Sequence, residues 1–440
     1  MPKRNNHISD LYRNRRMNEI KEQPKVQNFK NHISPIKPKC NYQIGFLRTA
    51  RKNIGTFLEY LWELSRSIRL YKGDVAIIVG KEKYTSEPIK TVYVGNHNND
   101  AFIFGRIYSE YEVIKKYEKI NSLHTSKWLK RYRDSADLLI TDVELLFCKM
   151  LPSKEFIQIP DWVVQKYEIP HTWESVLKSF RKNTKKTDLR KIRKYGFTYR
   201  FTTSDDECRS FYHKMHKPYI KKRFNAEADI ESEWEILRQF RKGGLLQILR
   251  GEEVVSAAVL KMLYGKLVVF VVGVPDNIEG EMFKGVFSAL YYFTIVHAYN
   301  NGCHEINFHG TRPLLNDGVF RYKRKWGTYV QDISFPRGDI LLQPLRFNAP
   351  LISFFSHNHF ITRDGKKLAG KILFGEHKVA KTDIEHCLKY HFTKGLDYLK
   401  IFSLLGFENG TKEWADTTHK AIRLHDLSHS PSSAEDFCRL

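Results

Sequence analysis

The sequence predicts an α/β fold in which a mixed sheet is flanked by helices. Within residues 171–335, strand-like and helical patterns follow one another in the order β-α-α-β-β-β-α-β. One expected strand, KLVVFVVGV (266–274), is apolar enough to be buried on both faces, as central strands covered by helices are. Two of the expected helices end at Gly196 and Gly302, where glycine can adopt the left-handed conformation of a helix cap.

Each element of this segment has its own local signal. The SDDE sequence at 204–207 is a capping box that starts a helix, and LLQILRGEEVVSAAVLKM (245–262) has the pattern of a hairpin around Gly251. In chain order, we expect a helix at 173–195, a strand at 197–203, helices from 204 and at 230–242, the hairpin, the strand at 266–274, a helix at 282–300 and a strand at 304–310.

The 440 residues exceed a single domain of ordinary size. We divide them into a disordered basic N-terminal tail (1–42), an N-terminal helix with a small α/β lobe (43–170), the segment above (171–335) and a C-terminal extension (336–440). The helix of the second unit is amphipathic and basic (46–71), which suits docking on its own domain or a membrane surface. We also expect a charged helix at 110–133 and a disordered tail around SHSPSSAEDF (428–437).

The composition favours anionic partners. Lys and Arg number 73 against 49 Asp and Glu, which gives a net charge of +24. Nucleic acid, phosphorylated cofactors and acidic membrane surfaces are candidate partners, and a lysine-rich proteome would explain the charge equally well. None of the six cysteines stands in a CxxC pair, which argues against zinc and disulfide frameworks, and we expect no metal. The N-terminus lacks a signal-peptide pattern and no apolar run has the ~20 residues of a membrane span, so we expect a cytoplasmic protein.

Several stretches of the chain resemble the GNAT acyltransferase superfamily, and within it the FemAB and CelD-like branch. The resemblance covers about residues 160–335 and rests on GGLLQILRGEEVVSAAVL (243–260), GKLVVFVVGV (265–274), GVFSALYYFTIVHAYNNGCHEINFHGTRP (285–313), DGVFRYKRKWG (317–327) and the basic RKNTKKTDLRKIRKYGF (181–197). It implies a GNAT-like sheet and, if residues 73–150 form a degenerate companion unit, two tandem GNAT-like lobes.

The resemblance also implies a donor site for acyl-CoA where the strand 266–273 leads into the long helix. A helix start favours phosphate, because its unpaired N–H groups and dipole are positive. The residues placed there by the resemblance are Val272, Gly273 and Val274 at the strand end and Lys284 and Gly285 in the helix. The chain departs from the family pattern here: the usual arginine- or glutamine-led glycine-rich loop is replaced by a stretch with Glu279 and Glu281. FemAB-like enzymes can use aminoacyl-tRNA instead, so the donor stays open.

The strand HEINFHG has one polar face, made by Glu305, Asn307 and His309. A central strand with a polar face borders either solvent or a cleft, and the resemblance implies the acyl-transfer centre beside this strand end. A lysine-type amine has a pKa near ~10.4 and must lose a proton before it attacks. A general base that takes this proton typically raises the rate ~10²–10⁴-fold. His309 is the preferred base because histidine titrates near neutrality, and Glu305 is the second candidate. A structural histidine at a strand end is an equally simple interpretation.

Beyond Gly310, basic and aromatic residues follow closely. Arg312 and Lys323 are candidate ligands of an anionic substrate group, and Tyr322 and Lys323 look like the family's Tyr-Lys pair. Asp317 is in the family-like position for a substrate contact, although NDG (316–318) is also an ordinary turn signal. Lys323 is the strongest candidate of this group.

Two further basic stretches could bind substrate. Arg190 and Arg193 belong to a helix with little apolar content, which is either a solvated face or a phosphate-binding surface. In MHKPYIKKRF (215–224), His216, Tyr219 and Arg223 could line the acceptor side.

Together these observations predict a GNAT-type N-acyltransferase that moves an acyl group, acetyl in the first instance, from acyl-CoA to an amine or hydroxyl. The acceptor would be a small molecule or sugar, as in cell-envelope or polysaccharide synthesis. Two alternatives remain open: FemAB-like transfer from aminoacyl-tRNA, and a non-catalytic GNAT-like module that binds RNA or another anionic polymer.

Overall fold

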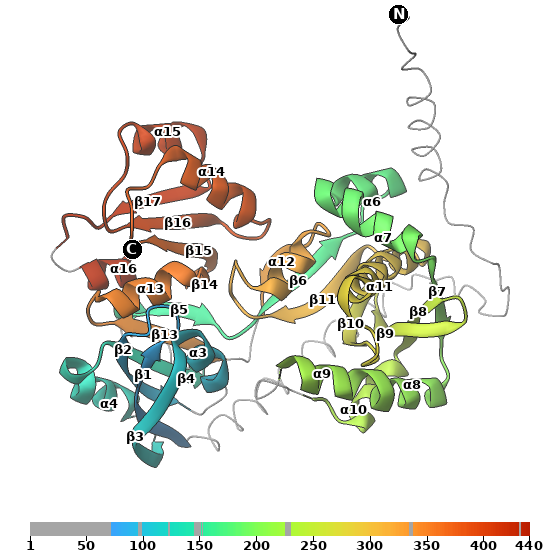
Figure 1. The fold of residues 1–440 in the computed structure, drawn as a ribbon, viewed down its shortest axis with the longest axis horizontal. Coiled ribbons are helices and arrows are strands. Elements are labelled where there is room, and N and C mark those ends of the chain that lie inside the picture. Colours follow the sequence, from blue (N-terminus) through green and yellow to red (C-terminus); the bar gives the residue numbers. More distant parts are fainter. Residues whose placement is uncertain are drawn as a thin grey trace, which may run out of the picture.

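The structure, a computed structural model, describes residues 72–95, 99–121, 124–144, 151, 153–224, 230–333, 338–430 and 433–440. The predicted basic tail (1–42) and amphipathic helix (46–71) lie outside these residues. The described chain forms two lobes that lie side by side (Figure 1). We call residues 72–160 together with 338–440 lobe I, and residues 163–332 lobe II.

Lobe II is built on a seven-stranded sheet with the order β12-β6-β11-β10-β9-β8-β7. Its strands are β6 (Val163–Glu168), β7 (Phe197–Thr202), β8 (Gly243–Arg250), β9 (Glu253–Leu263), β10 (Lys266–Gly273), β11 (Glu305–Thr311) and β12 (Tyr329–Asp332). β10 and β11 run parallel and the other neighbours run antiparallel. The sheet is therefore mixed, as the sequence predicts.

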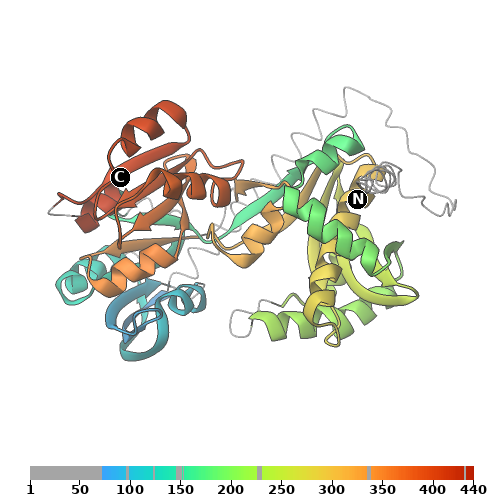
Figure 2. The same cartoon turned by 45° about the horizontal axis from the view of Figure 1, so that its top comes forward.

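Helices cover both faces of this sheet (Figures 1 and 2). They are α6 (Trp173–Ser179), a π-helix (Thr184–Asp188), α7 (Leu189–Lys194), α8 (Asp205–Phe211), a second π-helix (Tyr212–His216), α9 (Lys217–Phe224), α10 (Glu233–Phe240), α11 (Gly280–Asn300) and α12 (Gly318–Arg324). Along β8, Leu246 packs in the core with residues of α11, and its neighbour Leu245 packs in the core with residues of α8 and α10. Since successive strand residues point to opposite faces, α11 and the pair α8–α10 lie on opposite faces. The predicted order β-α-α-β-β-β-α-β is confirmed.

Lobe I contains two sheets that share one core. The six-stranded sheet has the order β3-β1-β2-β4-β13-β5 and the four-stranded sheet the order β14-β15-β16-β17. The strands are β1 (Lys72–Glu82), β2 (Pro88–Gly95), β3 (Tyr108–Asn121), β4 (Leu138–Glu144), β5 (Ile157–Pro160), β13 (Gly338–Pro344), β14 (Phe360–Asp364), β15 (Lys367–Phe374), β16 (Tyr398–Ser403) and β17 (Ile422–Asp426). The helices are α3 (Asp100–Ile107), α4 (Thr125–Tyr132), α13 (Ala349–His357), α14 (Lys381–Tyr390), α15 (Thr411–Thr418) and α16 (Ser433–Arg439). Ile78 of the first sheet, Phe354 of α13 and Phe402 of the second sheet belong to the same buried cluster.

The two ends of the described chain therefore meet in lobe I. β13 follows lobe II in the sequence but pairs with β4 and β5, which precede it. β6 lies before residue 170 but pairs with β11 and β12 of lobe II. The domain boundaries expected from the sequence stay predictions, and the structure adds these two exchanges between neighbouring units.

Three sequence-based expectations about elements are wrong. The charged helix expected at 110–133 is the edge strand β3 followed by the short α4, because the charges of β3 lie at a sheet edge, where they meet solvent as readily as on a helix. The single helix expected at 173–195 is interrupted at Phe180, which has an extended backbone and buries its ring against Trp326 at 5.2 Å. The disordered tail expected around 428–437 contains the start of α16, whose Phe437 ring lies 4.8 Å from that of Phe402 in the lobe I core.

Candidate functional site

The parallel strands β10 and β11 are paired at one end and separated at the other. Lys266–Val268 pairs with Glu305–Asn307, and the described residues contain no further pair between these strands. Where they separate, both strands are irregular: β10 is bulged against β9 between Val269 and Val271, and β11 is bulged against β6 between Asn307 and Gly310. A parallel pairing that stops leaves the facing backbone groups of both strands without a partner in the ladder. Side chains bind three of the carbonyl oxygens here: His216 binds that of Val272, and Lys323 binds those of residues 309 and 310. We call this open end, residues 269–273 and 308–310, the splay.

His309, the predicted general base, lies at the splay. Its φ of 66° is left-handed, a conformation that is costly for a residue with a Cβ atom. Its backbone N–H donates to Oδ1 of Asn307 at 2.8 Å, and its exposed ring meets the Phe270 ring edge-on at 6.2 Å between centroids. Since Phe270 lies in the bulge of β10, His309 faces β10 across the splay. Strained non-glycine residues of this kind concentrate at functional sites, and the catalytic role of His309 stays a prediction.

Lys323 reaches the same strand end from α12. Its Nζ donates to the carbonyl oxygens of His309 at 3.2 Å and Gly310 at 2.9 Å. The side chain is buried, with 5% of its surface exposed, and this burial lowers the pKa of the amine to about 7, with Asp317 as a weaker opposing influence. Lys323 is therefore close to the splay. It is a buried amine that binds backbone carbonyls, and its predicted binding of an anionic substrate group stays a prediction.

Glu305, the second candidate base, lies at the closed end of the strand pair. Lys266, its partner across the ladder, holds its carboxylate at 3.2 Å, Lys166 lies at 3.5 Å, and Tyr329 donates its O–H at 3.0 Å. Burial acts to raise the pKa of Glu305, but the hydrogen bonds and the two lysines outweigh it and the pKa is lowered. A carboxylate held in this way is a poor proton acceptor, and the structure does not bring it to the splay.

Arg312 and Asp317 hold the chain after the splay. The Arg312 guanidinium lies between the rings of Phe102, at 4.4 Å, and Trp162, at 4.3 Å, and donates to Oδ1 of Asn99 at 2.6 Å. These contacts join β11 to lobe I. Asp317 caps α12 by accepting the N–H groups of residues 319 and 320 at 2.8 and 2.9 Å. Arg312 therefore has a structural role between the lobes and Asp317 has one as a helix cap. Binding of substrate by either side chain stays a prediction.

The end of β10 is covered by the second π-helix. His216 is 2% exposed, and its Nδ1 lies 2.8 Å from the carbonyl oxygen of Val272. Burial lowers the pKa of His216, so the neutral ring is favoured, and its buried Nε2 has no hydrogen-bond partner among the described residues. A Cβ atom on Gly273 would come within 2.7 Å of the His216 backbone nitrogen, so only glycine fits there. Val274 is a core residue.

The start of α11, where a phosphate would be expected, carries a mixed charge. Glu279 precedes the helix and lies 3.5 Å from Nζ of Lys222. Lys284 is exposed in the second turn. Gly285 is buried, and a Cβ atom there would lie 3.1 Å from the Tyr195 ring. Glycine at this position permits close packing of α11. The packing alone explains the residue, and its predicted contact with a cofactor stays a prediction.

The remaining predicted substrate residues divide between buried and exposed positions. Tyr219 is buried and accepts a hydrogen bond from the exposed Arg223 at 2.6 Å. Burial raises the pKa of Tyr219 and also that of Tyr322, whose ring lies 3.7 Å from Nζ of Lys325. Phe287 of α11 lies between the two tyrosines, at 5.7 Å from Tyr219 and 6.4 Å from Tyr322. An aromatic row thus links α9 to α12.

Arg190 and Arg193 are exposed on α7. Nε of Arg193 donates to the carbonyl oxygen of Leu189 at 3.4 Å, within its own helix. The structure shows a solvated cationic face here, and capture of a phosphate by it stays a prediction.

The sequence analysis missed a buried polar cluster centred on Asp188. Its Oδ1 accepts from the Ser288 hydroxyl at 2.6 Å and from Nζ of Lys325 at 2.8 Å, which ties the first π-helix to α11 and α12. Burial lowers the pKa of Lys325 and the Asp188 carboxylate opposes this. The only available signal was an acidic residue inside a strongly basic run, since the partners are far away in the sequence.

The described residues contain neither a candidate metal site nor a candidate membrane-spanning helix. No three acidic, histidine or cysteine side chains in this part of the chain are grouped so that they could hold a metal ion. Among the helices described, none is long and apolar enough to cross a membrane.

Comparisons with known proteins give matches among solved structures alone. No protein-family model matches the chain, and no curated protein sequence matches it. Among solved structures, FemX is similar at 14% identity and a TM-score of 0.33, covering 64% of this chain and 86% of FemX. The C-terminal domain of a putative lysylphosphatidylglycerol synthetase from Agrobacterium fabrum is similar at 9% identity and 0.29, covering 63% and 85%. A GCN5-related N-acetyltransferase from Sphaerobacter thermophilus is similar at 13% and 0.29, covering 59% and 74%.

Proposed function

We propose that the chain is an acyltransferase whose reaction takes place at the splay. The observation that supports this is the separation of two parallel strands after three residue pairs, with His309 and Lys323 at the open end. An acyl carbonyl placed there could accept hydrogen bonds from backbone N–H groups of the separated strands while an amine approaches its carbon atom. A binding module would need neither the strained histidine nor the buried amine.

The two side chains have complementary roles in this proposal. The His309 ring takes a proton from the attacking amine as the new N–C bond forms. The carbonyl oxygen then carries a negative charge. Lys323 in its protonated form, which predominates below its pKa of about 7, supports this charge with the third N–H that its two carbonyl partners leave over. Collapse of this intermediate breaks the bond to the leaving group, which takes the proton from the His309 ring and departs as the thiol of coenzyme A or the hydroxyl of a tRNA.

The donor we propose first is an acyl-CoA, and acetyl-CoA is the simplest case. A second donor, aminoacyl-tRNA, is favoured by one observation: Glu279 occupies the helix start where a pyrophosphate would bind, and Lys222 is its partner there. A carboxylate near a phosphate is unfavourable, whereas a tRNA could be bound by exposed cations elsewhere on the lobe.

Donor-induced stabilisation tests the proposal before any acceptor is known. A donor at a hundred times its dissociation constant raises the free energy of unfolding by about 2.7 kcal/mol. We expect this stabilisation with an acyl-CoA or with an aminoacylated tRNA. We then expect transfer of the acyl group to some members of a panel of amines. Lys323→Ala and His309→Ala should slow transfer far more than they weaken donor binding, while Lys178→Ala, an exposed residue on α6, should change neither. Stabilisation by RNA or another anionic polymer that carries no acyl group, but by no donor, and without transfer, would refute the proposal and favour a polymer-binding module.

A further inference from the structure

Two lysines of lobe II lie together without an acidic partner. Lys242 immediately precedes β8, and its carbonyl oxygen accepts the N–H of Met262 at 3.1 Å, so it stands beside Lys261 of β9. Lys261 is half-buried and Lys242 is exposed. Neither forms an ion pair with any residue that the structure describes. A Cβ atom on Gly243 would come within 2.2 Å of the Leu260 carbonyl oxygen, and this close approach fixes Lys242 over β9.

The other charged groups near Lys261 do not neutralise it. Glu235 is the nearby carboxylate, but it already accepts from Nε and Nη2 of Arg238, both at 2.6 Å, and from Nε2 of Gln239 at 2.5 Å. The groups that influence Lys261 are therefore Lys242 and Arg238 on the cationic side and an already paired Glu235. Burial lowers the pKa of Lys261, Lys242 lowers it further, and the opposing influence of Glu235 is countered in part by Arg238.

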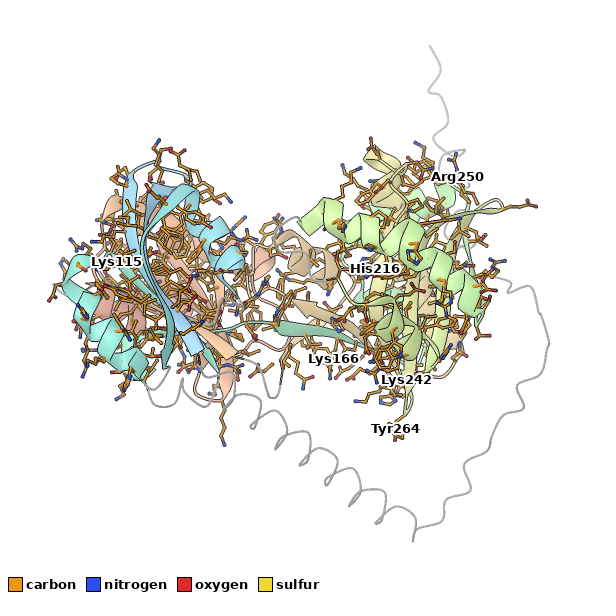
Figure 3. All side chains as sticks on the ribbon, turned by 90° about the horizontal axis from the view of Figure 1, so that it is seen from below. Lys115, Lys166, His216, Lys242, Arg250 and Tyr264 are labelled. Atoms are coloured by element: carbon orange, nitrogen blue, oxygen red, sulfur yellow. The ribbon has the colours of Figure 1, made fainter. Side chains whose placement is uncertain are left out.

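This lysine pair lies one aromatic ring away from the splay. Nζ of Lys261 is 5.3 Å from the centroid of the Phe270 ring, and the same ring meets His309 at 6.2 Å. Figure 3 labels Lys242 on this lobe, between the labels of His216 and Tyr264. A molecule that contacts both the lysine pair and His309 would thus lie along Phe270.

We infer that the acceptor of the proposed transfer carries an anionic group, a carboxylate or a phosphate, that binds between Lys242 and Lys261. This inference rests on the proposed function, because the acceptor amine must then reach His309 on the other side of Phe270. An anion at this place would relieve the repulsion between two neighbouring cations and make charge-assisted hydrogen bonds with both. The lysine pair selects the acceptor and takes no part in the chemical step.

Binding of inorganic phosphate and of citrate provides a test that needs no donor. Lysines labelled as ¹³C-dimethylamines give separate NMR signals, and Lys261→Met identifies the signal of Lys261. We expect this signal to move on addition of either anion, and its apparent pKa to rise, while Lys178, an exposed lysine of the same lobe, stays unchanged. Equal responses of Lys178 and Lys261 would indicate general screening and would overturn the inference, as would no response of Lys261.

A kinetic test separates this inference from the proposed function. With an amine acceptor that carries a carboxylate, Lys261→Met and Lys242→Met should each raise KM about tenfold and leave kcat unchanged. With the corresponding neutral amide, neither variant should change KM. Equal KM values for the charged and neutral acceptors, with transfer intact, would overturn the inference alone. Anion binding at Lys261 without any transfer would overturn the proposed function, and the assignment of the site to an acceptor with it.

Discussion

The burial of Lys323 should make the stability of the protein rise with pH in the weakly alkaline range. The folded protein holds this amine at a pKa of about 7, whereas the ordinary value, which the unfolded chain recovers, is 10.5. Between these values the unfolded chain binds a proton that the folded protein does not. This proton binding lowers the free energy of unfolding. The loss is absent above pH 10.5, grows as the pH falls, and becomes constant below about pH 7.

The magnitude follows from the difference between the two pKa values. One pH unit of complete difference is worth about 1.36 kcal/mol. Raising the pH from 7, where the folded amine is half protonated, to 9 should therefore recover about 2 kcal/mol of unfolding free energy. Lys323→Met removes the titrating group and should remove this dependence. The two carbonyl oxygens of residues 309 and 310 would lose their donor in the variant, but that loss is the same at both pH values.

Urea unfolding of the wild type and Lys323→Met at pH 7, 8 and 9 measures the effect. The difference between the two proteins isolates Lys323, since every other group titrates equally in both. Lys378→Met, at an exposed position of lobe I, is the control and should show a constant difference from the wild type. A constant difference for Lys323→Met over the same range would show that the buried amine stays protonated and would refute the reasoning.

Three further substitutions test the geometry around the splay. Gly273→Ala should lower the free energy of unfolding by about 1–3 kcal/mol in urea, because its Cβ atom would lie 2.7 Å from the His216 backbone nitrogen; an unchanged value would mean that the π-helix shifts freely. His309→Gly should be about 1 kcal/mol more stable than His309→Ala, since the φ of 66° suits glycine, and equal stabilities would argue against strain at this position. Arg312→Lys should lose about 1 kcal/mol, measured by thermal unfolding, because an ammonium group cannot stack between the Phe102 and Trp162 rings; a melting temperature equal to the wild type would contradict this.

The sequence predicts the elements of lobe II well where the signal is local. The apolar run of β10, the capping box before α8 and the glycines at helix ends each report a structure made within a few residues. Local signals predict the wrong structure where a contact with a distant residue determines the conformation. Phe180 interrupts a helical pattern because Trp326 receives its ring, and α16 is ordered because the lobe I core accepts Phe437. Neither partner is visible from the local sequence.

The same distinction applies to the site. The polar face of the strand 304–310 and the Lys323 motif can be recognised from the sequence. His309 of that face and Lys323 lie at the splay, whereas Glu305 of the same face lies at the closed end of the strand pair. The sequence gives no indication that Lys323 is buried, because its carbonyl partners are 13 and 14 residues away. It also gives no indication of the Asp188 cluster, whose partners Ser288 and Lys325 lie 100 and 137 residues away.

The splay is held from both lobes, which gives lobe I a role in the proposed reaction. Beyond the open end of β11, Arg312 is fixed between Phe102 of lobe I and Trp162, and donates to Asn99 of lobe I. α12, which carries Lys323, is fixed by Arg324, which donates to the carbonyl oxygen of Lys389 at 2.9 Å and to that of residue 390 at the end of α14. The strand end and the helix that place His309 and Lys323 are thus each attached to lobe I. A shift between the lobes would have to move both groups, so the separation of β10 from β11 depends on the contact between the lobes as well as on the sheet itself.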